Sequence, residues 1–209
     1  MGLKEKTIGA LVSQFHRPRG LGGRAAGWVM ATRGSNRKRN LWAVGLLDVQ
    51  PNDRVLEIGF GPGIAIQEIA RRTTNGLVVG VDHSEVMVRQ ARRRNTAAVR
   101  AGRVDLRLGT AEHLPALDAP FDKILAVNSL MFWDDPTARL EELRGLLRPG
   151  GRIAIAYQPR GPGSSDDTAA QAGHEMAEQF GAAGFTEIRV ETLDLRPTNA
   201  VCVLGVRPR

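Results

Sequence analysis

A run of three alternating glycines is the feature that most constrains how this chain can fold. Gly59, Gly61 and Gly63 follow the apolar segment 54–57, which predicts a strand, and precede 65–70, which predicts a helix. Strand, tight turn and helix in this order form the context in which a glycine loop binds a nucleotide. Glycine is needed where the backbone takes positive φ or comes too close to a ligand for a Cβ. The alternative is a glycine-rich turn that binds no ligand.

The spacing of the glycines separates two kinds of ligand. A dinucleotide-binding loop requires the pattern G-x-G-x-x-G, whose third glycine lets the helix pack closely on the strand. Here Ile64 occupies the sixth position, and the third glycine comes one residue earlier, at Gly63. A nicotinamide-dependent dehydrogenase is therefore the most distant alternative.

The composition is typical of a globular protein with one domain-sized core. Hydrophobic residues make up 42% of the chain and charged residues 24%, which are ordinary values. No apolar run approaches the roughly 20 residues of a membrane span, and we expect no secretory signal. Cys202 is the only cysteine, which excludes an intramolecular disulfide and a cysteine metal cluster. We therefore expect a cytoplasmic protein, and no cluster of His, Asp or Glu predicts a metal site.

Positive charge is concentrated at the N-terminal end. Residues 1–40 contain nine Lys and Arg against Glu5, a net charge of +8 in a chain whose total is +7. Nucleic acid, an anionic membrane surface or an acidic substrate could bind such a segment. The alternative is a solvated basic segment that binds no partner. Aromatic residues that could stack on bases are few in and beside it. Nucleic acid is therefore the less favoured partner.

Helical patterns come first, and alternating strands and helices follow. Residues 3–15, 25–33 and 36–47 show helical apolar spacing, with no strand among them. Strands are predicted at 54–57, 77–82, 104–109, 121–127, 152–157, 187–193 and 201–206. Helices are predicted between them at 65–70, 84–95, 136–147 and 168–183.

This order predicts an α/β fold with a mostly parallel sheet and helices on both faces. Ligands of such folds bind at the carboxyl ends of the strands. The last two strands are joined only by residues 194–200, which are too few for a helical crossover. We expect these two strands to pair antiparallel at the edge of the sheet.

The run from Glu57 to Gly63 resembles the first motif of the class I S-adenosylmethionine (SAM)-dependent methyltransferases, and the whole pattern resembles their ubiquinone/menaquinone-biosynthesis group. The resemblance covers about residues 50–206. It implies a Rossmann-like seven-stranded sheet, mostly parallel with an antiparallel last strand, and SAM as methyl donor with S-adenosylhomocysteine (SAH) as product. In the family the loop wraps the amino-acid half of SAM, and the carboxylate orients its ammonium group directly or through water. The residues implied are Glu57, Gly59, Phe60, Gly61 and Gly63.

The second motif falls at the end of the second predicted strand. Asp82 ends that strand, where a carboxylate can accept both ribose hydroxyls of an adenosine. His83 and Met87 match the family positions that pack against adenine. For Asp82 alone, a turn or helix-capping role is the alternative.

The segment 109–115, which follows the third predicted strand, resembles the third motif of the family. In the family, the backbone and an acid of this loop contact the adenine amino group. Thr110 stands where an Asp is usual, so either Glu112 or the backbone of Ala111 is left to make this contact.

The segment 121–136 resembles the fourth motif of the family. Asn128 and Ser129 follow the fourth predicted strand, which implies contact with SAM near its methyl group. A histidine is familiar in the final part of this motif, but Phe132 and Trp133 take its place here. Trp133 is therefore either a core residue or a wall of an apolar acceptor pocket.

The resemblance divides the chain into a helical lid, residues 1–48, and a SAM-binding domain, residues 49–209. Asn40 and Trp42 are expected to face the site from the lid. No catalytic base is identified, and His16 and His174 are candidates only by elimination.

The leading functional interpretation is methyl transfer from SAM to O, N or C of an unidentified small molecule. Such an in-line displacement needs chiefly proximity and alignment. Two alternatives stay open, a SAM-binding regulator without activity and an RNA or DNA methyltransferase that uses the basic segment. The sequence leaves monomer and homodimer undecided.

Overall fold

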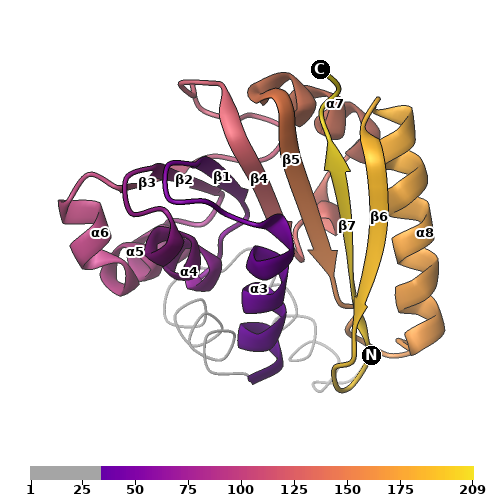
Figure 1. Cartoon of the computed structure of the whole chain (residues 1–209). Helices are drawn as coiled ribbons and strands as arrows, with labels where there is room; N and C mark the ends of the chain where they lie inside the picture. The colour runs from indigo at the N-terminus through magenta and orange to yellow at the C-terminus, as the bar shows by residue number, and fades with distance from the viewer. Residues whose placement is uncertain (1–33) are drawn as a thin grey trace.

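The computed structural model describes residues 34–209, which form a sheet covered by helices on both faces (Figure 1). The helices expected at 3–15 and 25–33, most of the basic segment, and His16 lie outside the described residues. The helix expected at 36–47 is α3, Gly34–Leu47.

The sheet has seven strands in the spatial order β3-β2-β1-β4-β5-β7-β6. Strands β1 to β5 pair in parallel, whereas β7 runs antiparallel to both β5 and β6. The expected fold class and the antiparallel pairing of the last two strands are confirmed, and β6 forms the edge beside the reversed β7. The strands are β1 (Arg54–Ile58), β2 (Leu77–Asp82), β3 (Val104–Leu108), β4 (Phe121–Val127), β5 (Leu147–Tyr157), β6 (Thr186–Leu193) and β7 (Ala200–Val206).

Side-chain caps begin three of the helices that cover the sheet. Ser84 before α5 (Glu85–Arg94), Asp135 before α7 (Pro136–Leu146) and Ser165 before α8 (Asp166–Ala182) each accept a backbone N–H of the first turn, which otherwise lacks a partner. The remaining helices are α4 (Ile64–Arg72), α6 (Thr96–Arg100) and the 3-10 turn η1 (Leu130–Phe132). No helix within residues 34–209 is both long enough and apolar enough to cross a membrane.

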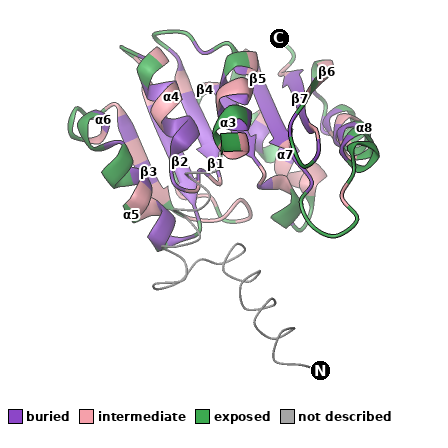
Figure 2. Ribbon diagram, turned by 90° about the horizontal axis from the view of Figure 1, so that it is seen from below, coloured by how far each residue is buried: buried purple, intermediate pink, exposed green. Residues whose placement is uncertain are grey.

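The core lies on both faces of the sheet because the central strands alternate apolar residues between two helix layers (Figure 2). Val55 packs in a cluster with residues of α3 and α4, and Leu56 packs in a second cluster with residues of α7 and α8. Strands buried on both faces are almost continuously apolar, which is characteristic of parallel sheets. Polar residues on these strands are therefore confined mainly to their ends.

Helix α3 is docked into the first core cluster by its C-terminal half. Ala43, Val44 and Leu47 are completely buried there. This docking holds the N-terminal half of the helix beside the carboxyl ends of β4 and β5. The helix thus contributes to the site described below.

We expect Leu47→Ala to lower the free energy of unfolding by about 2–5 kcal/mol, because the substitution removes a completely buried side chain and leaves a cavity. Urea denaturation followed by circular dichroism measures this change.

Leu108→Ala is the matched control, since Leu108 is 51% exposed and its truncation should change the free energy of unfolding by no more than about 0.5 kcal/mol. Equal effects of the two substitutions would contradict the docking of α3 into the core.

Candidate functional site

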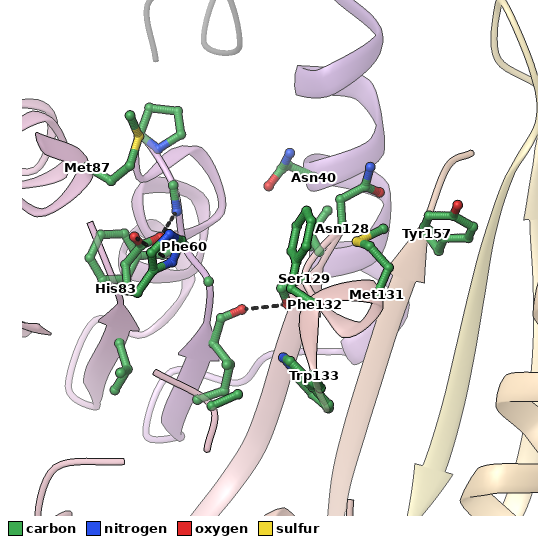
Figure 3. Close-up of a pocket in the computed structure, with 18 of the residues that line it drawn as sticks. Asn40, Phe60, His83, Met87, Asn128, Ser129, Met131, Phe132, Trp133 and Tyr157 are labelled. Atoms are coloured by element: carbon green, nitrogen blue, oxygen red, sulfur yellow. Dashed lines mark hydrogen bonds and ion pairs between the residues drawn. The ribbon is translucent and has the colours of Figure 1, made fainter. Parts of the chain in front are cut away.

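A cavity of about 870 Å³ opens at the carboxyl ends of β1, β2, β4 and β5 (Figure 3). It lies where the strand order changes direction, because β1 is followed by β2 on one side and by β4 on the other. Open α/β sheets bind their ligands at this switch point. The volume is within the range of small-molecule and cofactor sites.

The three glycines of the loop after β1 serve different purposes, although each has positive φ. A Cβ on Gly59 would lie 2.7 Å from the Cβ of Ser129, and a Cβ on Gly63 would lie 2.7 Å from the Cβ of Ala91. Those two glycines allow the loop to approach β4 and α5. A Cβ on Gly61 would meet nothing within 4 Å, so this glycine faces open space at the cavity wall.

Asp82 holds the glycine loop in place from the end of β2. Its Oδ2 accepts the backbone N–H of Gly61 at 2.8 Å, and its Oδ1 accepts that of Ser84 at 2.9 Å. Burial raises the pKa of this carboxyl, and the two backbone hydrogen bonds oppose that change. Each carboxylate oxygen has a further lone pair available, so the group can accept more donors from the cavity.

Glu57 lies behind the glycine loop, and its carboxylate is almost completely buried. The backbone N–H of Ile66 donates to it, whereas Oε2 has no hydrogen-bond partner among residues 34–209. Burial raises the pKa of Glu57 well above its usual range, and the nearby Asp82 carboxylate adds to this effect. The site therefore contains a buried acidic group whose hydrogen bonding is incomplete.

The predicted adenine contacts lie together at one end of the cavity. His83, Met87, Thr110, Ala111 and Glu112 all line it. Figure 3 shows His83, Met87 and the predicted loop residue Phe60 on the same side. The hydroxyl of Thr110 accepts the backbone N–H of His113 at 3.1 Å.

The other side of the cavity is formed by the ends of β4 and β5 and by α3. The side chain of Asn128, a non-glycine residue with φ of 53°, exchanges two hydrogen bonds with the backbone of Gln158 at 2.9 and 3.2 Å. Ser129 donates its hydroxyl to the carbonyl of Ile58 at 3.1 Å. Asn40 from α3 and Tyr157 from β5 lie beside Asn128 (Figure 3). Asn128 therefore links the ends of two neighbouring strands at the cavity.

Some predicted residues lie away from the cavity wall. Glu57 and Gly63 are behind the wall, and Trp42 packs against the first core cluster. His174 is on α8, with its side chain 71% exposed and its Nε2 3.3 Å from Glu178. Trp133 is both buried in the second core cluster and part of the cavity wall.

Sequence reasoning missed five polar residues that line the cavity: Asn36, Arg39, Tyr157, Gln158 and Arg160. The last three end β5 or follow it directly, so the rule that located Asp82 and Asn128 could also have found them. The only sequence signal for Arg39 was its position directly before Asn40. Residues 34–209 contain no group of three or more His, Cys, Asp or Glu side chains that could hold a metal ion.

Comparisons with known proteins agree with this architecture. Residues 55–151 match a family described as a methyltransferase domain. The chain is 33% identical to an uncharacterized methyltransferase of Bacillus subtilis strain 168, YdaC, over 88% of this chain and 98% of YdaC. It is 32% identical to the ubiquinone/menaquinone biosynthesis C-methyltransferase UbiE of Geotalea daltonii, over 58% of this chain and 52% of UbiE.

A solved structure with the same fold is a SAM-dependent methyltransferase from Thermotoga maritima, described as a possible histamine N-methyltransferase. The two chains have a TM-score of 0.59 and 25% sequence identity, over 83% of this chain and 89% of the other. The match to YdaC spans nearly both proteins, and the fold and glycine loop agree with it. The chain therefore belongs to the class I SAM-dependent methyltransferase family.

Proposed function

We propose that this protein binds SAM in the cavity and transfers its methyl group to a small-molecule acceptor. In this proposal Asp82 binds the ribose, and His83 and Met87 pack on the adenine beside the loop 110–112. The glycine loop, with Glu57 behind it, holds the amino-acid half. Asn128 and Ser129 border the position of the methyl group.

The incomplete hydrogen bonding of Glu57 is the observation that carries this proposal. A buried carboxylate is costly unless it is paired with a cation or with further donors. The ammonium and sulfonium groups make the sulfur end of SAM cationic, so it suits a site that contains both Glu57 and Asp82. A dinucleotide would instead bring an anionic pyrophosphate toward the two carboxyl groups. The charge of the site thus favours SAM over a dinucleotide, as does the glycine spacing.

Bound SAM would supply a methyl group already activated by a sulfonium. The chain's own task is to align an acceptor with that group and to exclude water, and well-oriented pairs reach effective molarities on the order of 10⁵–10⁸ M. Tyr157 lies at the acceptor side, and burial raises the pKa of its hydroxyl, so it keeps its proton at neutral pH. We infer that Tyr157 does not act as a general base for the acceptor.

The division into a lid, residues 1–48, and a catalytic domain, residues 49–209, is also a proposal. It is supported by α3, since Asn36, Arg39 and Asn40 on one side of that helix line the cavity. The apolar side chains of Met131 and Phe132 are 42% and 47% exposed and line the same region. These surfaces suit an acceptor with an apolar body.

Calorimetric titration with SAM and SAH tests the cofactor assignment. We expect micromolar binding of both ligands to the full chain, and binding at least about tenfold weaker to Gly61→Arg and Asp82→Asn. The arginine side chain would enter the open space at Gly61, and asparagine removes the charge that faces the ribose hydroxyls.

Each variant has a matched control. Gly102 also has positive φ and open space around its Cβ position but lies outside the cavity wall, so Gly102→Arg should leave binding unchanged. Asp167→Asn is the control for Asp82→Asn. It changes an exposed carboxylate in the first turn of α8, so it should also leave binding unchanged. No binding of either ligand to the unmodified chain would overturn the proposed function.

Glu57→Gln should change stability and binding in opposite directions. The pKa of Glu57 is raised in the folded state, so above the unfolded value of 4.5 the folded chain holds more of this proton than the unfolded chain. Stability then falls as pH rises from about 4.5 toward the folded pKa. Glutamine removes this loss, so the ligand-free variant should be more stable than the unmodified protein by about 1–3 kcal/mol at pH 7, with a smaller gain at pH 4.5. It should also bind SAM more weakly.

Thermal and urea unfolding at the two pH values measure the stability change, and calorimetry measures the binding. Glu141→Gln, at an exposed position of α7, is the control and should alter neither quantity. A Glu57→Gln protein that is less stable at pH 7 and binds SAM normally would refute the role given to the Glu57 charge.

A further inference from the structure

Two arginines meet at the acceptor side of the cavity. Arg39 comes from α3, and Arg160 comes from the segment that follows β5. Both donate to the same atom, Oε1 of Gln158, at 2.6 and 2.7 Å. The two guanidinium groups are thus held beside each other, although their like charges repel.

The group between the arginines is fixed and carries no net charge. Gln158 is completely buried, and its Nε2 donates to the carbonyl of Thr198 at 2.7 Å, which determines the direction of Oε1. Two further hydrogen bonds of the pair go to neutral oxygens. Arg39 donates to Oδ1 of Asn36, and Arg160 donates to the hydroxyl of Ser35 at 2.8 Å.

The positive charge of Arg39 is buried without a compensating carboxylate from residues 34–209. Arg39 is 4% exposed, its Nε has no hydrogen-bond partner among the described residues, and no carboxylate oxygen of residues 34–209 lies within 4.0 Å of its nitrogens. Burial, with a smaller contribution from Arg160, lowers the pKa of this guanidinium to about 9, so it stays charged at neutral pH. A buried charge of this kind is stabilised by an anion from outside the chain.

We propose that the methyl acceptor carries an oxyanion, a carboxylate or a phosphate, that binds between Arg39 and Arg160. The planar guanidinium fork matches both groups. Met131, Phe132 and Tyr157 line the adjoining wall and would contact the apolar body of the acceptor. This assignment rests on the proposed function and defines its substrate class as amphipathic organic acids or phosphate esters.

The carboxylate of SAM itself is the other source of an oxyanion. The glycine loop that would hold the amino-acid half of SAM follows β1, whereas Gln158 and Arg160 follow β5, two strands away. Neighbouring strands lie about 4.8 Å apart, so the ends of β1 and β5 are separated by about 10 Å. The arginine pair is therefore displaced from the loop toward the acceptor.

Anion titration of the SAH-saturated full chain tests this assignment, with sodium benzoate and inorganic phosphate as separate probes and calorimetry as the readout. We expect saturable binding of at least one probe to the unmodified protein, and binding about tenfold weaker or more to Arg39→Gln and Arg160→Gln. Whichever probe binds more tightly identifies carboxylate or phosphate as the preferred group. Arg71→Gln, an exposed position of α4 that pairs with Glu68, should match the unmodified protein.

Arg160 is exposed and its replacement leaves the core intact, so the test does not depend on the folding of Arg39→Gln. No anion binding to the unmodified chain, or equal binding to Arg160→Gln, would overturn the proposal. A second comparison uses SAH and 5′-methylthioadenosine, which lacks the amino-acid carboxylate. If Arg39→Gln or Arg160→Gln weakened SAH binding and left methylthioadenosine binding unchanged, the oxyanion would be that of the cofactor, and the acceptor assignment would fall.

The failure of the proposed function has a different signature. If the chain bound neither SAM nor SAH, the proposed function would be refuted. The same anion titration could still be run on the unliganded protein. Anion binding there, lost in the two arginine variants, would support the oxyanion site independently.

Discussion

The parallel pairing of β1 with β2 and β4 is the interaction on which the whole site depends. Ile58 pairs with Val81 on one side and with Ala126 on the other, so the three strands end at the same edge of the sheet. The pairing is fixed because the side chains of these strands are buried on both faces, where a shift of one residue would exchange the two apolar sets. The glycine loop, Asp82 and Asn128 meet for this reason, although they are far apart in the sequence.

A buried acid and a buried guanidinium lie at the two sides of the cavity. Glu57 lies behind the glycine loop, and Arg39 lies at the end formed by α3 and β5. Neither has a described partner of opposite charge, so each is a cost to the ligand-free protein. In the proposed reaction, a cationic donor and an anionic acceptor would each meet the complementary charge. This arrangement would also favour the correct orientation of the two ligands before the methyl group moves.

Helix α3 shows why single residues near one another in the sequence can serve different purposes. Asn36, Arg39 and Asn40 are spaced by three and four residues, so they lie on one side of the helix and line the cavity. Trp42 is two residues beyond Asn40, which turns it to another side, and it packs against the core. The prediction that both Asn40 and Trp42 face the site did not apply this periodicity. Helix α6 was not predicted for a different reason. It spans only Thr96–Arg100, which is too short to show a helical period of apolar residues.

The sequence was sufficient to predict the architecture and the glycine-loop end of the cavity, because those features rest on local patterns. Alternating strands and helices, glycines at every second position and an acid at the end of β2 are each contained in a short segment, and the parallel sheet then brings the segments together. The end of the cavity formed by α3 and β5 could be recognised only in the folded protein. Arg39 and Gln158 are separated by 119 positions, and they meet because Ala43, Val44 and Leu47 dock α3 against the sheet. No local pattern records that contact, since it depends on how a helix outside the alternating units packs on the finished sheet.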